Sequence, residues 1–149
     1  MRLLARPAQK IVARATFEAA ELSLALGPEH LLLATIELGA EEIEAFGVTA
    51  DDIRERIQAD ERDALASLGI SLASVRGELE ERLGEHAWAS SCLGMSPEAK
   101  RVLDIATRRR RVVTPQHVQL ALVQHSKTVR RLLLDLGVPL GALEAKLRR

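Results

Sequence analysis

The chain has 149 residues and carries 21 basic and 21 acidic side chains, so its formal net charge at pH 7 is zero. With no net charge, the protein as a whole should not be attracted to nucleic acid or to an anionic membrane. Any partner that binds through electrostatics has to contact a local charged patch. Aromatic residues make up 2% of the chain whereas Leu and Ala together account for 47 residues, a composition that favours helices over strands. We therefore expect an all-α protein that folds as one domain over residues 1–149.

Cysteine usage and hydropathy indicate a cytoplasmic protein without a membrane segment. Cys92 is the only cysteine, which excludes an internal disulfide and fits a reducing compartment. Basic residues interrupt the amino-terminal stretch before it can form the apolar core of a signal peptide. No run approaches the ~20 apolar residues that a membrane-spanning helix needs.

The first two elements expected along the chain are a surface helix and a buried helix. Residues 8–26 place apolar side chains at intervals of three and four, the spacing of an amphipathic helix, which Gly27 ends. The apolar stripe comprises Val12, Ala15, Ala19, Leu22 and Leu26. Pro28 suits the first position of the next helix, which is apolar on nearly every side and is therefore expected at the centre.

Glycine residues divide the rest of the first half. Gly39 is expected to end the second helix, and a short helix then runs to about Phe46. Gly47 can adopt the left-handed conformation that turns the chain into a fourth helix, which we predict over Ala50–Gln58.

A surplus segment separates this half from the next. Residues 64–83 repeat the helix, glycine turn and helix pattern of residues 45–57 and 135–147. This middle copy is either an inserted helical pair or one end of a longer connection. Residues 84–94 lose the helical spacing and are predicted to form a connecting loop, which Trp88 holds to the core rather than forming an exposed contact.

The second half follows the plan of the first. Helices are expected from Ser96-Pro97 to about Arg109, from Thr114-Pro115 to His125, from Lys127 to Leu136, and after Val138-Pro139. The predicted boundaries are a first half-repeat at about 1–59, an inserted helical block and connector at about 60–95, and a second half-repeat at about 96–149.

One motif occurs twice. Gly27-Pro28-Glu29-His30 and its apolar run return as Thr114-Pro115-Gln116-His117 and a second apolar run, and a Gly-Val pair precedes the last helix of each half. We therefore predict two pseudo-repeated four-helix half-domains that pack as one bundle, with an extra helical segment between them.

The opening Gly-x-Glu-His-Leu-Leu-Leu of the second helix, together with Ser96–Ala106 and Leu133–Leu147, resembles the amino-terminal domain of Clp ATPases of the ClpA and ClpC type. The resemblance covers essentially the whole chain and implies a bacterial Clp repeat domain that receives substrates and adaptor proteins and hydrolyses nothing. The sequence contains no P-loop, whose glycines and lysine would hold phosphates. The chain is therefore either a free-standing copy without the AAA+ modules or a fragment of something longer.

The function that the resemblance implies is a non-catalytic protein-binding module without a cofactor. It would recognise protein segments, adaptors or Clp ATPase and protease components, and could regulate proteolysis by competing for clients. Sequence motifs for hydrolases are also missing, including Gly-x-Ser-x-Gly and His-Glu-x-x-His. The alternative is a small helical regulatory protein that binds nucleic acid or a transcription factor through Arg108–Arg111, although four arginines without stacking aromatics also suit the solvated end of a helix.

Members of the ClpC type bind phosphorylated arginine at the start of each buried helix, where N–H groups favour an anion and a glutamate holds the guanidinium. Glu29 matches that glutamate, but Gln116 does not. Pro28 and Pro115 stand where the family usually has threonine, which removes a hydroxyl and an N–H donor. The resemblance thus implies a weakened first site and a second site that is largely lost. In the alternative interpretation, Glu29 only stabilises the helix dipole.

The resemblance also implies a hydrophobic docking patch, formed by the amino-terminal segment and the connector before the second half. Leu3 and Leu4 would face Met95, Pro97 and Lys100 in this patch. Lys100 matches the family pattern, but the aromatic anchors are missing. Because such anchors usually supply most of the binding energy, cyclic peptide antibiotics should bind only weakly. Alternatively, these apolar residues are an ordinary edge of the core.

His30 and His117 recur at one position of the motif and invite a metal-site interpretation. Neither has a second ligand four residues later. We therefore interpret both as hydrogen-bonded residues that fix a helix start, and we expect no metal site.

Overall fold

The structure, a computed structural model, describes residues 6–22, 26–67, 95–108 and 112–148. Within these ranges every regular element is a helix, and the one extended pairing is an isolated bridge between Leu26 and Met95. The predicted all-α class is confirmed for this part of the chain.

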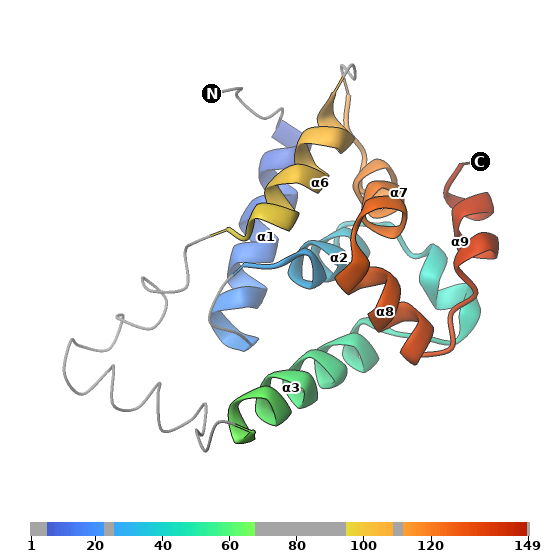
Figure 1. Ribbon diagram of the computed structural model, residues 1–149. Coiled ribbons are helices and arrows are strands. Elements are labelled where there is room, and N and C mark those ends of the chain that lie inside the picture. Colours follow the sequence, from blue (N-terminus) through green and yellow to red (C-terminus); the bar gives the residue numbers. More distant parts are fainter. Residues whose placement is uncertain (1–5, 23–25, 68–94, 109–111, 149) are drawn as a thin grey trace.

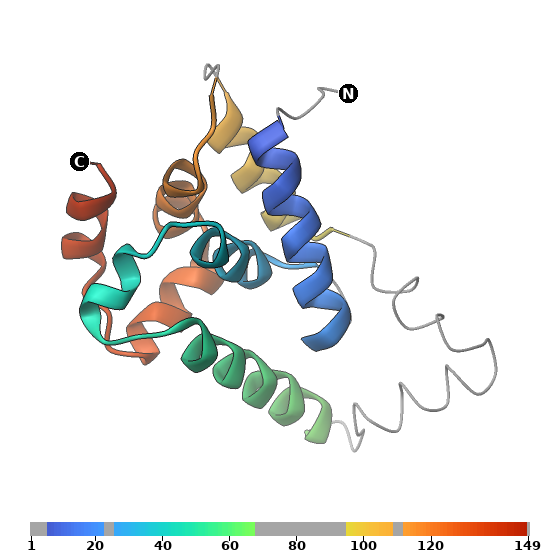
Figure 2. The ribbon, with the colours of Figure 1, turned by 180° about the vertical axis from the view of Figure 1, so that it is seen from behind.

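The helices form a bundle around two central members (Figure 1). Their bounds in chain order are α1 Arg6–Leu22, α2 Pro28–Glu37, the 3₁₀ helix η1 Glu42–Phe46, α3 Ala50–Ala66, α6 Pro97–Thr107, α7 Pro115–His125, α8 Lys127–Asp135 and α9 Leu140–Leu147. Helices α2 and α7 contact each other, α1 packs on α2, α6 packs on α7, and α9 packs on both α7 and η1. Figure 2 shows α9 and η1 together on the side of the bundle away from α1.

Helix α2 has the buried position that its composition predicts. Leu31, Leu32 and Leu33 are all completely buried, although they point in different directions around the helix axis. Pro28 occupies its first turn, where no N–H partner is needed. Helix α7 is the second central element, and its Val118 and Leu122 are also fully buried. The core therefore lies around the α2–α7 contact.

Two glycines turn the chain in the same way in the two halves of the molecule. Gly47 and Gly137 each have a φ of 82°, a left-handed conformation that side-chain-bearing residues rarely adopt. The N–H of each glycine donates to the carbonyl three residues earlier, and the valine that follows each one is buried. The turn predicted at Gly47 is confirmed.

The expectation for the first helix is wrong at its end and on one face. Helix α1 ends at Leu22, and Leu26 is extended because its carbonyl accepts a hydrogen bond from the Ser96 N–H at 2.9 Å. Glu18, which does not belong to the predicted apolar stripe, is nevertheless buried, and Arg54 of α3 binds both of its carboxylate oxygens, at 3.1 and 2.7 Å.

The fourth helix of the first half is longer than expected. Helix α3 continues past Gln58 to Ala66, so it includes the first residues assigned to the inserted block. Residues 59–66 contain no glycine or proline to end a helix. They are rich in charged residues and lack the regular apolar spacing that would predict the extension of the helix. The rest of the middle block and the predicted loop, with Trp88 and Cys92, lie outside the described residues.

Candidate functional site

The start of α2 is fixed by a buried histidine. The Gly27 N–H donates to His30 Nδ1 at 2.9 Å, and the His30 side chain is completely buried. Burial lowers the pKa of His30 to about 4, although the negative charge of Glu18 acts in the opposite direction. Because Nδ1 accepts a hydrogen bond, His30 is neutral, and its 3.7 Å contact with Glu29 is not an ion pair.

The start of α7 has the same histidine hydrogen bond and a second, reciprocal hydrogen bond. The Thr114 N–H donates to His117 Nδ1 at 3.1 Å, and the His117 N–H donates back to Thr114 Oγ1 at 3.2 Å. This reciprocal pair is a capping box with histidine in the place of glutamate. The interpretation of both histidines as residues that fix a helix start is confirmed. Among the described residues, no group of three His, Cys, Asp or Glu side chains could hold a metal ion.

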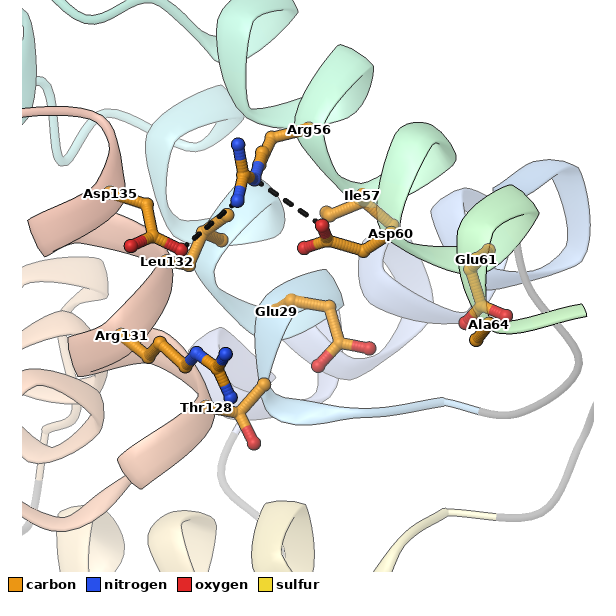
Figure 3. Close-up of a pocket in the computed structure, with 10 residues that line it drawn as sticks. All are labelled: Glu29, Arg56, Ile57, Asp60, Glu61, Ala64, Thr128, Arg131, Leu132 and Asp135. Carbon is orange, nitrogen blue, oxygen red and sulfur yellow. Dashed lines mark hydrogen bonds and ion pairs between the residues drawn. The ribbon is translucent and has the colours of Figure 1, made fainter. Parts of the chain in front are cut away.

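A cavity of about 570 Å³ opens at the start of α2, between α3 and α8 (Figure 3). It is lined by Glu29, Arg56, Ile57, Asp60, Glu61, Ala64, Thr128, Arg131, Leu132 and Asp135. Glu29 lies in the middle of the cavity in this view, with the α3 residues on one side and the α8 residues on the other. Of the residues predicted for binding, Glu29 is the one that lines this cavity.

The ion pairs around the cavity leave some charges without a partner. Arg56 contacts Asp135 at 3.1 Å and Asp60 at 3.3 Å, which joins α3 to α8. Within the described part of the chain, Glu29 and Glu61 have no cationic partner, and Arg131 has no carboxylate partner. Among the described residues, the cavity thus presents two carboxylates without a cationic partner and one guanidinium without a carboxylate partner.

The environment of Glu29 disfavours its charged form. Its side chain is 18% exposed. Burial raises the pKa of Glu29, a hydrogen bond from its own N–H partly opposes this, and the negative charges of Glu61, Glu98 and Asp60 raise it further. A cationic ligand would relieve both the burial cost and the repulsion among these carboxylates, so the cavity favours a cation near Glu29.

The carboxylate of Glu29 lies close to Gly27, the residue that precedes α2. A Cβ atom added to Gly27 would lie 2.6 Å from Glu29 Oε1. The carboxylate therefore occupies the space where an external anion would meet the N-terminus of α2, and buried Pro28 offers no N–H there. This geometry agrees with the alternative interpretation of Glu29 as a partner of the helix dipole, while leaving the cavity beside it open.

Gln116, at the equivalent position of α7, has a different environment. Its Nε2 donates to the Gly39 carbonyl at 3.2 Å, which ties the start of α7 to the end of α2. Gln116 and the half-buried Pro115 do not line the cavity. The two predicted sites are thus placed at corresponding helix starts, and the structure does not bring them together.

The residues of the predicted docking patch fall at the start of α6. Met95 is half-buried and packs against the core, while Pro97 and Lys100 are exposed. Leu3 and Leu4 lie outside the described residues, so their expected contact with this segment is not tested.

The arginine-rich segment is described at one residue. Arg108 is exposed and pairs with Asp104 of the same helix at 2.6 Å. Arg109–Arg111 lie outside the described residues.

Sequence reasoning missed most of the cavity residues. Arg56 and Asp60 are four residues apart, a spacing that can reveal a pair on one helix face. The pairing of Arg56 with Asp135 joins distant segments, and nothing in the local sequence of either residue indicates it.

No protein-family model matches this chain. Among the described helices, none combines the length and the apolar character needed to span a bilayer.

Proposed function

We propose that this chain is a non-catalytic protein-binding module related to the amino-terminal domain of Clp unfoldases. It acts in the cytoplasm by binding protein segments, adaptors or Clp ATPase and protease components, and it competes for clients of the Clp protease. The two pseudo-repeated four-helix half-domains are part of the same proposal.

Matched structural positions support the two half-domains. Helices α2 and α7 both begin with a proline and a histidine that accepts a hydrogen bond from the residue before the helix. After the turns at Gly47 and Gly137, α3 and α9 bury corresponding residues at the same spacing: Ile53 and Ile57 in α3, and Leu143 and Leu147 in α9. Local sequence and burial therefore repeat together.

The cavity around Glu29 is the observation that carries the functional proposal. Glu29 and Glu61 provide carboxylates that suit a guanidinium, and Arg131 provides a cation on the opposite wall. A phosphorylated arginine carries both kinds of charge, so its guanidinium would face Glu29 and its phosphoryl group would face Arg131. The Thr128 hydroxyl is not a donor for this ligand, because it donates to Glu98 at 2.9 Å.

The proposal includes one weakened site rather than two. The Glu29 carboxylate already covers the N-terminus of α2, so a phosphoryl group cannot use that terminus as an anion cradle. Gln116 carries no charge and is engaged with Gly39. The docking patch of Pro97, Lys100 and the segment before them would supply a second contact for adaptors, and cyclic peptide antibiotics would bind there only weakly.

The nucleic-acid alternative receives less support. Arg108 is neutralised by Asp104, and the chain has no net positive charge. Filter binding with duplex DNA at low salt is the direct test of that alternative.

The proposed function can be tested with an unfolded polypeptide prepared with and without phosphorylated arginine. Fluorescence anisotropy should show saturable binding of the phosphorylated form, and the polypeptide should remain intact afterwards. Glu29→Gln should weaken this binding by about tenfold, the loss of one charged contact. Arg62→Gln, an exposed change elsewhere on α3, is the matched control and should bind as the wild type does. Equal affinity for both polypeptides, unaffected by Glu29→Gln, would overturn the proposal.

A further inference from the structure

A second, shallower cavity of about 390 Å³ lies where α6 meets the end of α7 and the start of α8. It is lined by Arg101, Ile105, Gln124, His125, Lys127 and Arg130. Three of these side chains carry a permanent positive charge, and the lining contains no carboxylate. Its charge is therefore opposite in character to that of the cavity around Glu29, where carboxylates outnumber guanidiniums.

The three cations of this cavity have no ion-pair partner in the described part of the chain. Arg54 and Arg56, by contrast, each contact at least one carboxylate. Arg131 of the other cavity also lacks a carboxylate partner among the described residues, but there it stands alone beside several acids, whereas here three cations gather without one.

The carboxylates closest in sequence to Arg101 are used elsewhere. Glu98, one turn before it on α6, accepts hydrogen bonds from Ser126 Oγ at 3.1 Å, the Lys127 N–H at 3.0 Å and Thr128 Oγ1 at 2.9 Å. Asp104, one turn after it, pairs with Arg108. Both acids that could neutralise Arg101 within its own helix are thus engaged by other groups.

The cluster contributes nothing favourable to folding that the structure reveals. Lys127 and Arg130 are three residues apart on α8, where like charges on one face repel each other. Cations near the N-terminus of a helix also oppose its dipole, although the Glu98 carboxylate, which accepts the Lys127 N–H, offsets part of this cost. An external anion would relieve the repulsion between the two cations.

We propose that the cavity formed by Arg101, Lys127 and Arg130 binds an acidic segment of a partner polypeptide, with its carboxylates on the cations and an apolar side chain on Ile105. A polypeptide fits better than a nucleic acid, because the cations surround one small cavity, its lining contains no Phe, Tyr or Trp to stack on a base, and the chain as a whole is neutral. This inference does not depend on the proposed role of Glu29. The two cavities use different residues of α8, namely Lys127 and Arg130 here and Thr128, Arg131, Leu132 and Asp135 there.

The test is fluorescence anisotropy with a short labelled peptide of glutamate residues carrying one leucine, at low ionic strength. The wild-type protein should bind it, and the double variant Lys127→Gln/Arg130→Gln should bind at least about tenfold more weakly. Arg62→Gln/Lys146→Gln removes the same charge from exposed positions outside both cavities and should retain the wild-type affinity. Glu29→Gln should also retain it, which separates this site from the proposed phosphoarginine site.

Thermal unfolding of the same variants excludes a folding artefact. Lys127→Gln/Arg130→Gln should have an unchanged or higher Tm, because it removes like-charge repulsion. Equal loss of peptide binding in the Arg62→Gln/Lys146→Gln control would show a general charge effect and overturn the proposal. Tighter binding of single-stranded DNA than of the peptide, lost in the Lys127→Gln/Arg130→Gln variant, would also overturn it in favour of a nucleic-acid surface.

Discussion

The starts of α2 and α7 share a proline and a capping histidine but differ in the residue between them. At α2 that residue is Glu29, whose carboxylate faces a cavity together with other acids. At α7 it is Gln116, which donates to the Gly39 carbonyl and does not line that cavity. The shared residues therefore serve the fold, and the residue that differs is the one that lines the cavity at α2 and ties α7 to the end of α2.

The surroundings of the two helix starts also differ in their buried charges. The first half contains a buried ion pair, in which Glu18 is 5% exposed at its side chain and Arg54 holds both of its oxygens. Helix α9 has Glu144 at the position that corresponds to Arg54. The ion pair of Glu18 and Arg54 thus has no counterpart at the corresponding described position of α9.

The largest expected effect comes from removing this charge pair. Arg54→Ala leaves buried Glu18 with only its longer, 3.5 Å contact to Arg14 and should lower the free energy of unfolding by about 3 kcal/mol. Glu144→Ala, the corresponding change in the second half, should lower it by less than about 0.5 kcal/mol. Urea denaturation of both variants measures the difference. Equal losses would show that the two halves are stabilised alike.

The buried histidine of α2 should make the stability of the protein depend on pH. The pKa of His30 is about 4 in the folded protein, below the value of about 6.5 for an unfolded histidine. The unfolded chain therefore binds more protons between these values, and the protein should lose about 3 kcal/mol as the pH falls from 6.5 to 4.

Denaturant melts across this pH range measure the contribution of His30. His30→Gln should remove most of the pH dependence, whereas Glu29→Gln should leave the part due to His30 in place. A wild-type stability that does not change between pH 6.5 and 4 would contradict a buried, neutral His30.

The caps of the two helices offer a smaller contrast. Thr114→Ala removes the hydroxyl that accepts the His117 N–H and should cost about 1 kcal/mol. Gly27 has no side chain to cap α2, so Gly27→Ser is the matched change at the first start. Its new Cβ would meet the Glu29 carboxylate, the movable end of a side chain, and the net effect on Tm should be smaller than that of Thr114→Ala. A larger effect at Gly27 would mean that the position of this carboxylate matters more to stability than the cap does.

The smallest expected effect is a slight increase in Tm from Glu29→Gln. Because burial raises the pKa of Glu29 above its unfolded value, ionisation of Glu29 weakens the fold, and Glu29→Gln should raise Tm slightly at neutral pH. The gain should disappear at a pH low enough to protonate Glu29 in both the folded and unfolded states. Gln116→Glu, which removes the donor to Gly39, should lower Tm instead.

The sequence predicts the helix starts well because their signals are local. Proline and a cap residue mark the beginnings of α2, α6 and α7 in the positions where the structure has them, and Gly47 marks its turn. The two histidines are also assigned correctly from the sequence, since each acts on the residue three positions before it.

The remaining features depend on contacts between distant segments. Glu18 is buried because of Arg54, and Leu26 is extended because of Ser96, so helical spacing alone places both residues wrongly. The cavity combines the start of α2 with the exposed faces of α3 and α8, whose relative placement is not encoded in any local motif. The sequence therefore indicated Glu29 but not Arg56, Glu61 or Arg131.

The most direct test of the account is the stoichiometry of phosphoarginine binding. Isothermal titration calorimetry should show a single weak site on the wild-type protein, binding about tenfold weaker to Glu29→Gln, and unchanged binding to Gln116→Ala. Two equal tight sites, or one site that Glu29→Gln leaves intact, would contradict the assignment of binding to the cavity at the start of α2.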